Sequence, residues 1–285
     1  MVKQSYNHLI NLKNTLKYQC QLHYNHMSII KVARIDAPIH RTGAAYVAHI
    51  LNNYKYEVEI KTSSKEEAFR SLVENESDLL VSSWIPGFHL HNMTTALPYH
   101  DNVLALGTLF HPYFSWFVPG YVAEGLATSV EDLTDPDTAA LFFREIYVIN
   151  CDDYSALFFQ DTIAKHRLDD AGFEFKHVSE DVFTEALAGH TKEARPCLVA
   201  FWSPCSLKFK YNLRELEGIT HPAVPSGKAV LLMHKNAITK LNISARNALQ
   251  HVYLSNDKAS MLEQLVFEEH YHIEIALKII EQDTP

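Results

Sequence analysis

Apolar residues follow two periods along the chain, and stretches of the two kinds alternate. Continuous or alternating apolar runs are typical of strands, whereas apolar positions three and four residues apart are typical of helices. At the start of one helical stretch Ser64 stands three residues before Glu67, the pattern of an N-terminal capping box. The alternating order favours a parallel sheet covered by helices. The first series comprises predicted strands at 28–35, 56–60 and 78–84 and predicted helices at 42–53 and 64–75.

A second series of the same kind follows an apolar segment that contains Pro119 and Gly120. No stretch rich in Ser and Gly separates the two series, so we expect two lobes joined by crossing strands rather than independent domains on a linker. From about Ala229 the chain predicts one more strand and then mainly helices. The predicted strands of this second half are 145–149, 173–178 and 196–202, and the predicted helices are 154–166, 180–187, 243–254 and 258–267.

The composition is that of a globular protein and excludes several functional classes. Among 285 residues, 47% are hydrophobic and 21% are charged, which suffices for a buried core. The formal net charge is −9 and the 25 basic residues are scattered, so no basic face is present for nucleic acid or an anionic membrane. Only 9 glycines occur, and none forms a G-x-G-x-x-G or Walker-type loop, which argues against nucleotide binding.

The N-terminal residues lack the pattern of a targeting segment. Residues 1–26 hold no apolar run of about seven or more, and no stretch of the chain approaches about 18 apolar residues. We therefore expect residues 1–27 to be an extension outside the fold, or the start to be assigned upstream of the true one. The four cysteines form no C-x-x-C pair, which excludes a zinc knuckle and a thioredoxin-type motif.

Two tryptophans stand at the carboxyl ends of predicted strands, and a proline follows each of them two residues later. The two segments are Trp84–Pro86 and Trp202–Pro204. In open α/β sheets ligands bind beyond the carboxyl ends of the strands, so both indoles can converge on one cleft. Indole faces are the best protein seat for a cation that cannot donate hydrogen bonds. The alternative is that both are core residues, because tryptophan is highly buried on average.

The order of several short motifs resembles a known family. These motifs are Trp84-x-Pro86 with His89, residues 117–121 leading into 129–135, and Trp202-x-Pro204 with residues 210–213. Together they resemble the glycine betaine and proline betaine substrate-binding proteins of ABC transporters. The resemblance implies an α/β fold of the type II periplasmic-binding kind, with two lobes, each a mostly parallel sheet flanked by helices, and a ligand cleft between them. Lobe one would comprise residues 28–115 and 206–285, and lobe two residues 116–205.

The resemblance also implies an aromatic cage for the trimethylammonium group of the ligand, with Trp84 and Trp202 at cage positions. In the family, backbone amides and polar side chains hold the ligand carboxylate. Trp116 belongs to an aromatic run, residues 113–117, at the expected lobe crossing, and alternation places Phe114 and Trp116 on one face of it. Core packing is the favoured interpretation of this run, and a contribution of Trp116 or Tyr113 to the cage is the alternative. The predicted ligand-binding residues are Trp84, Pro86, His89, Trp202, Pro204, Cys205, Tyr154, Asp36 and Trp116.

Three departures from the family concern the anionic half of the expected site. Cys205 stands where relatives commonly have a histidine, and Asn150–Tyr154 replaces a glycine-rich turn. Asp36 lies near the first strand, where relatives often carry an aromatic residue. The two aspartates within the replaced turn would repel a carboxylate. The resulting hypothesis is a ligand that is cationic or differently decorated, and not necessarily glycine betaine.

Two other kinds of site compete with this interpretation. His89 and His91 alternate on one segment, but no carboxylate or cysteine completes a recognisable ligand set, so neither a metal nor another cofactor is expected. A thiol nucleophile at Cys151 or Cys205 would make the chain a cytosolic ligand sensor or a repurposed enzyme on the same fold. We favour a binding protein that is not an enzyme and has no catalytic residue.

The resemblance implies a transport role for the expected solute-binding protein. A small quaternary-ammonium or betaine-like solute would be bound by hinge closure, and the partners would be an ABC permease and its ATPase subunits. The location would be extracytoplasmic, either periplasmic or membrane-associated. Because the sequence shows no signal peptide, the cytoplasm is the alternative.

Overall fold

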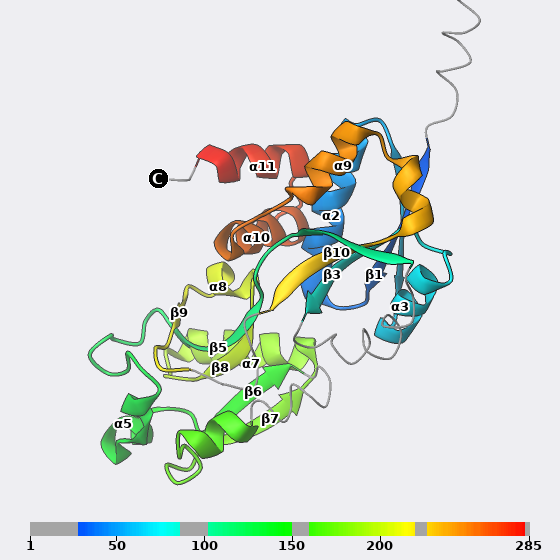
Figure 1. The fold of residues 1–285 in the computed structure, drawn as a ribbon. Coiled ribbons are helices and arrows are strands. Elements are labelled where there is room, and N and C mark those ends of the chain that lie inside the picture. Colours follow the sequence, from blue (N-terminus) through cyan, green and yellow to red (C-terminus); the bar gives the residue numbers. More distant parts are fainter. Residues whose placement is uncertain (1–27, 86–101, 150–159, 220–226, 283–285) are drawn as a thin grey trace, which may run out of the picture.

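In a computed structural model, the chain forms two five-stranded sheets with helices packed against them, and the sheets occupy separate lobes of the molecule (Figure 1). The structure describes residues 28–85, 102–149, 160–219 and 227–282. The α/β fold class and the two-lobe arrangement predicted from the sequence are confirmed.

The first sheet has the strand order β2-β1-β3-β10-β4. β1 is parallel to β2 and to β3, whereas β10 is antiparallel to both β3 and β4. The strands are β1 (Ile29–Ile35), β2 (Glu57–Ser63), β3 (Leu79–Ile85), β4 (Val103–Thr108) and β10 (Lys228–His234).

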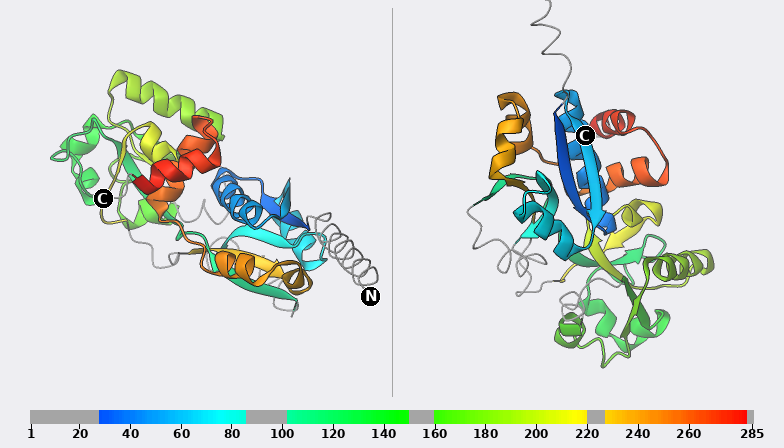
Figure 2. Two further views of the ribbon diagram at one scale, coloured as in Figure 1. Left: turned by 90° about the horizontal axis from the view of Figure 1, so that it is seen from above. Right: turned by 90° about the vertical axis from the view of Figure 1, so that its right-hand side faces the viewer.

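Helices cover both faces of the first sheet, and two separate apolar clusters fill the space between sheet and helices. Phe69 and Leu72 bring α3 onto one face, against Leu80 of β3. The other helices of this lobe contribute to the second cluster, and the right-hand view of Figure 2 shows α10 and α11 on the side of the sheet away from α3. The helices are α2 (Pro38–Asn53), α3 (Lys65–Val73), α9 (Ile243–Gln250), α10 (Asn256–Glu263) and α11 (Ile273–Gln282), with single turns η2 (Lys235–Lys240) and η3 (Gln264–Glu268).

The second sheet has the order β7-β6-β8-β5-β9. β6 is parallel to β7 and β8, whereas β5 is antiparallel to β8 and β9. The elements of this lobe are β5 (Tyr113–Pro119), η1 (Glu131–Thr134), α5 (Pro136–Leu141), β6 (Glu145–Ile149), β7 (Glu174–Val178), α7 (Glu180–Glu193), β8 (Val199–Ser203), α8 (Leu207–Lys210) and β9 (Leu213–Glu215).

The local signals in the sequence are confirmed where they are strongest. The Ser64 hydroxyl accepts a hydrogen bond from the backbone N–H of Glu67 at 3.3 Å, so Ser64 caps α3 as its spacing predicted. The expected parallel sheets, by contrast, are both mixed, because β5 and β10 enter antiparallel to their neighbours.

Sheet membership divides the chain differently from the expected lobe boundaries at two points. A boundary between residues 115 and 116 would cut β5, all of which belongs to the second sheet. A boundary at 205/206 would separate β9 from the sheet in which it pairs with β5. We propose instead that the chain changes lobe within residues 109–112 and again between Ile219 and Gly227, which keeps both sheets whole. No helix in the described part of the chain combines the length and apolarity needed to cross a membrane.

Candidate ligand-binding site

The structure brings the two predicted cage tryptophans together through a third ring. The indole of Trp84 in β3 stacks on the ring of Phe114 in β5, with centroids 5.2 Å apart and planes 14° apart. Phe114 in turn meets the indole of Trp202 in β8 edge-on, at 6.5 Å and 85°. The three rings are nearly buried, with exposed fractions of 6%, 8% and 7%. We call Trp84, Phe114 and Trp202 the aromatic bridge, because it joins the two sheets.

Strand pairing explains why these rings meet. Phe114 and Trp202 stand directly opposite each other in the antiparallel pair β5–β8. Directly opposed side chains on one face of such a pair contact each other. Trp84 is the penultimate residue of β3, so it projects from the end of the first sheet toward β5. The two strand ends therefore meet at these rings, whereas their joint role in a ligand cleft stays a prediction.

A glycine beside Trp84 completes this corner of the site. Gly227 donates its backbone N–H to the carbonyl of Pro112 at 3.2 Å, which ties the second lobe crossing to the first. A Cβ atom at Gly227 would collide with the Trp84 indole. Only glycine lets the backbone approach the ring so closely. No pattern in the sequence indicates this contact, because the two residues are distant in the chain.

β3 is irregular just before Trp84. Ser82 has a positive φ of 58°, and the pairing of β10 with β3 shifts register between Val230 and Leu232. An irregularity of this kind bends a strand and changes the direction of its last side chains. Ser82 and Ser83 are both buried, and neither hydroxyl has a hydrogen-bond partner within the described residues. The direction of Trp84 at the end of β3 therefore depends on the irregular backbone at Ser82 and on the register shift in β10.

Two other predicted residues flank the aromatic bridge. Pro204 follows Trp202 by two residues and is preceded by a cis peptide bond. Cys205 is buried, and its backbone N–H donates to the Ser260 hydroxyl at 2.9 Å. Burial raises the pKa of the Cys205 thiol well above its ordinary value. A thiol of this kind stays protonated at neutral pH and is a poor nucleophile.

Two other predicted site residues, Asp36 and Trp116, do not take part in the aromatic bridge. Asp36 is exposed just beyond β1, where its backbone N–H donates to the Ser63 carbonyl at 2.9 Å. Because β1 and β3 are parallel neighbours, Asp36 and Trp84 lie at the same edge of the first sheet. Trp116 is 0% exposed and packs edge-on against Phe175 at 5.6 Å. Trp116 therefore packs in the core of lobe two here, and its contact with a ligand stays a prediction.

The remaining predicted residues cannot be placed. Pro86, His89 and Tyr154, together with Cys151 of the alternative interpretation, lie outside the described residues. Within the described ranges, no three His, Cys, Asp or Glu side chains gather into a group that could hold a metal ion.

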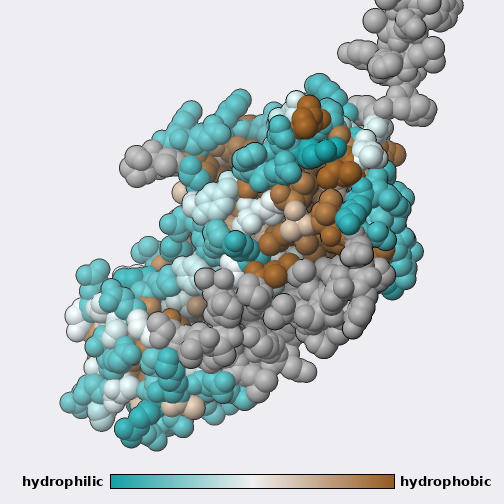
Figure 3. All heavy atoms as spheres, viewed as in Figure 1, coloured by the Kyte–Doolittle hydropathy of each residue, from teal (hydrophilic) through white to brown (hydrophobic). Residues whose placement is uncertain are grey.

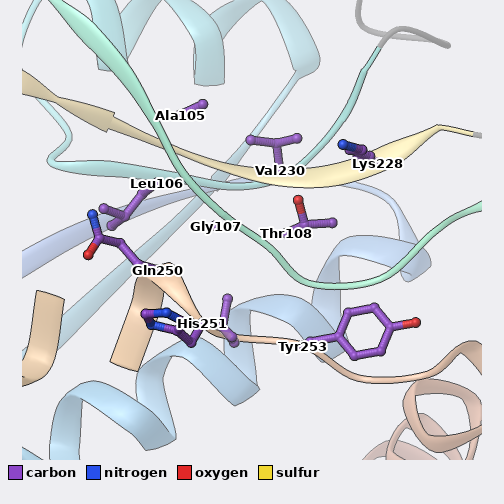
Figure 4. A pocket seen from close by; sticks show the side chains of 10 residues that line it. Ala105, Leu106, Gly107, Thr108, Lys228, Val230, Gln250, His251 and Tyr253 are labelled. Carbon is purple, nitrogen blue, oxygen red and sulfur yellow. The ribbon is translucent and has the colours of Figure 1, made fainter. Parts of the chain in front are cut away.

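A hollow of about 550 Å³ opens on the first lobe, apart from the aromatic bridge (Figure 4). It lies over β4 and the start of β10, with Gln250, His251 and Tyr253 on its other side. Figure 3 shows hydrophobic side chains gathered on this part of the upper lobe. Among the residues that the structure describes, none of the predicted site residues lines this hollow.

Two mixed α/β lobes between which the chain crosses twice form the architecture of type II periplasmic-binding proteins. Solved structures share it over most of their length. Lactococcal OpuAC, closed and complexed with glycine betaine, is 18% identical, with a TM-score of 0.67 over 90% of this chain and 96% of that one. The glycine betaine/L-proline-binding protein from Borrelia burgdorferi is also 18% identical, with a TM-score of 0.63 over 90% and 94%. These likenesses establish the fold.

A third solved structure, an ABC-transporter choline-binding protein in complex with choline, is 17% identical, with a TM-score of 0.62 over 90% of this chain and 89% of that one. No curated protein matches the sequence significantly. Residues 29–279 match the family described as the substrate-binding domain of ABC-type glycine betaine transport systems. The chain belongs to this family, and the resemblance in its short motifs is confirmed.

Proposed function

We propose that the protein binds a small solute with a quaternary ammonium group at the aromatic bridge and delivers it to an ABC transporter. The observation that carries the proposal is the contact of Trp84, Phe114 and Trp202 across the two lobes. A quaternary ammonium cannot donate hydrogen bonds, so aromatic faces are its most favourable protein surroundings. Each desolvated cation–π contact contributes about 1–2 kcal/mol.

The stacked arrangement defines how a ligand would enter. Trp84 and Phe114 now cover each other's faces, so a cation can reach those faces only if the stack opens. The two rings belong to different sheets, and a hinge motion of the lobes would separate them. We therefore expect the ligand to replace the Trp84–Phe114 contact with two ring–cation contacts as the lobes close around it.

The polar surroundings favour a ligand without a carboxylate close to the ammonium. Cys205 offers no positive charge, and its buried thiol remains neutral. Asp36 adds an exposed carboxylate at the edge of the first sheet that also carries Trp84. These features support choline or a related cation over glycine betaine as the preferred solute.

A catalytic role receives no support from Cys205, because its thiol is buried and its pKa is raised. We propose that the protein is a binding component rather than an enzyme. Its partners would be the permease and ATPase subunits of the transporter, and its location would be extracytoplasmic, as the family implies.

A ligand screen tests the proposal. Melting temperature is measured with choline, carnitine, glycine betaine and proline betaine, and with plain amino acids as controls. A specific ligand stabilises the folded protein by mass action, by about 2.7 kcal/mol when its concentration is one hundred times the Kd. The melting temperature rises as a consequence. The shift should vanish in Trp84→Leu and Trp202→Leu. It should persist in Trp116→Phe, which alters a buried tryptophan outside the bridge. No shift with any quaternary ammonium would contradict the proposal.

A further inference from the structure

The first residue of α10 is bonded to the first crossing between the lobes and to the end of β8. The Asn256 side chain donates to the carbonyl of His111 at 2.8 Å and to the Ser203 hydroxyl at 3.2 Å. Its amide oxygen accepts the His111 N–H at 3.3 Å. His111 lies in the crossing that precedes β5, and Ser203 directly follows Trp202 in β8. A single side chain of lobe one therefore holds the first crossing and the end of β8 beside the aromatic bridge.

Two further side chains on the same face of α10 are bonded to the residues that follow Trp202. The Ser260 hydroxyl accepts the Cys205 N–H at 2.9 Å and donates to the Asn256 carbonyl at 2.8 Å. One turn further on, the Glu263 carboxylate accepts the Ser206 N–H at 2.8 Å. Positions four and three residues apart share one face of a helix. Three side chains of α10 thus bind the segment from Ser203 to Ser206.

Glu263 is the unusual member of this set, because its carboxylate is buried. The residue is only 4% exposed. Arg41 of α2 lies 3.9 Å from its other oxygen, and the guanidinium of Arg41 stands over the ring of Phe267 at 5.3 Å. The acidic groups that face it are Glu180 of α7 and Glu268 of η3. Glu268 is itself paired with Lys210 of α8 at 2.9 Å, so burial is the main cost of ionising Glu263.

The charge balance sets the direction of any pH effect. Burial raises the pKa of Glu263 from its ordinary value of 4.5 to about 7, despite the opposing effects of the Ser206 N–H and Arg41. The folded protein, in which Glu263 accepts the Ser206 N–H, therefore favours the protonated Glu263 side chain. The stability of this bonded arrangement is complete below the ordinary carboxyl pKa and is progressively lost as the pH rises toward about 7.

We propose that Asn256, Ser260 and Glu263 form a hinge latch that positions Trp202 for the ligand, and that ionisation of Glu263 loosens it. The latch residues are positioning residues, since none of them belongs to the aromatic bridge. The inference rests on the proposed binding of a quaternary ammonium. It adds that ligand affinity depends on pH through a group remote from the ligand. Tighter binding below neutral pH is the consequence.

The test has one arm with ligand and one without. Calorimetry with choline chloride, or with glycine betaine if that binds better, is carried out at pH 5.5 and 8.0 on the wild type and on Glu263→Gln. The wild-type Kd should rise by on the order of tenfold between these pH values. Glu263→Gln keeps an acceptor for Ser206 but cannot ionise, so its Kd should stay nearly constant. Glu274→Gln, which removes an exposed acid of α11, should behave as the wild type.

The ligand-free arm uses hydrogen–deuterium exchange of residues 203–210. The ratio of wild-type to Glu263→Gln exchange rates cancels the intrinsic pH dependence, and it should rise from pH 5.5 to 8.0. If no probe binds, the proposed function fails while this ratio still decides whether the latch exists. Ser260→Ala provides a second variant, with faster exchange at both pH values. Identical pH dependence of affinity or of exchange in the wild type and Glu263→Gln would overturn the proposal.

Discussion

The indole of Trp84 lies parallel to the ring of Phe114, 5.2 Å away, although the two residues belong to different sheets. This stack, with Trp202 edge-on to Phe114, joins β3 of the first sheet to β5 and β8 of the second. Under the proposed function, this stack transmits the hinge motion of the lobes to the ligand, and its aromatic faces hold the cation. The predictions below depend on that dual role.

Phe114 should contribute to ligand affinity as much as a tryptophan of the bridge does. Phe114→Leu keeps most of the apolar volume but removes the aromatic face, and we expect binding of a quaternary ammonium to weaken by about 1–2 kcal/mol. Phe114→Tyr should retain binding. Calorimetric Kd values of the two variants check this. Equal affinity of the leucine variant and the wild type would remove Phe114 from the site.

Two glycine substitutions should change stability in opposite directions. Gly227→Ala would drive a methyl group into the Trp84 indole, which we expect to cost roughly 1–3 kcal/mol and to weaken ligand binding. Gly189 lies within α7 with open space around it, so Gly189→Ala should stabilise the protein by roughly 0.5–1 kcal/mol. Urea unfolding measures both. Similar values for the two variants would show that Trp84 is not confined by the backbone of Gly227.

An ion pair at the base of the first sheet should matter more than the surface pairs. Lys240 contacts both carboxylate oxygens of Asp78, at 2.7 and 2.9 Å, and Asp78 is buried. Lys240→Met leaves that carboxylate without its cation, and the free energy of unfolding should fall by about 3 kcal/mol. Lys235→Met, an exposed lysine in the same turn, should change it by less than about 0.5 kcal/mol. Comparable losses in both variants would contradict this account.

The Cys205 thiol should be unreactive in the folded protein. Burial raises its pKa, so little thiolate forms even in mildly alkaline solution. Iodoacetamide labelling at pH 8, followed by peptide mapping, should modify Cys205 only after unfolding. Cys205→Ser should also bind ligand as the wild type does. Fast labelling in the folded state would instead revive the interpretation of a thiol enzyme.

The sequence predicted the elements better than the way they combine. Strongly periodic stretches, such as those that became β1, α3 and β3, are confirmed. β4 was not predicted, because this edge strand is mostly half-buried and shows no clear alternation. β9 has only three residues, too few to carry a periodic signal.

The candidate site shows the same limit. Trp84 and Trp202 were predicted to converge because strand ends of a sheet point toward a common crevice. Alternation correctly placed Phe114 and Trp116 on one face of β5. It could not say that Phe114 meets the other lobe while Trp116 is fully buried in its own, because that depth depends on how the two sheets approach each other. The contacts of Gly227 and Glu263 likewise join residues far apart in sequence.

Calorimetric titration of choline and glycine betaine into the wild type, Trp84→Leu and Trp202→Leu tests the central claim most directly. The account predicts saturable binding of at least one quaternary ammonium, choline before glycine betaine. Each leucine variant should bind it about five- to thirtyfold more weakly, because a lost contact costs about 1–2 kcal/mol and 1.4 kcal/mol is about tenfold in Kd. Binding that survives both substitutions unchanged would place the ligand elsewhere and contradict the account.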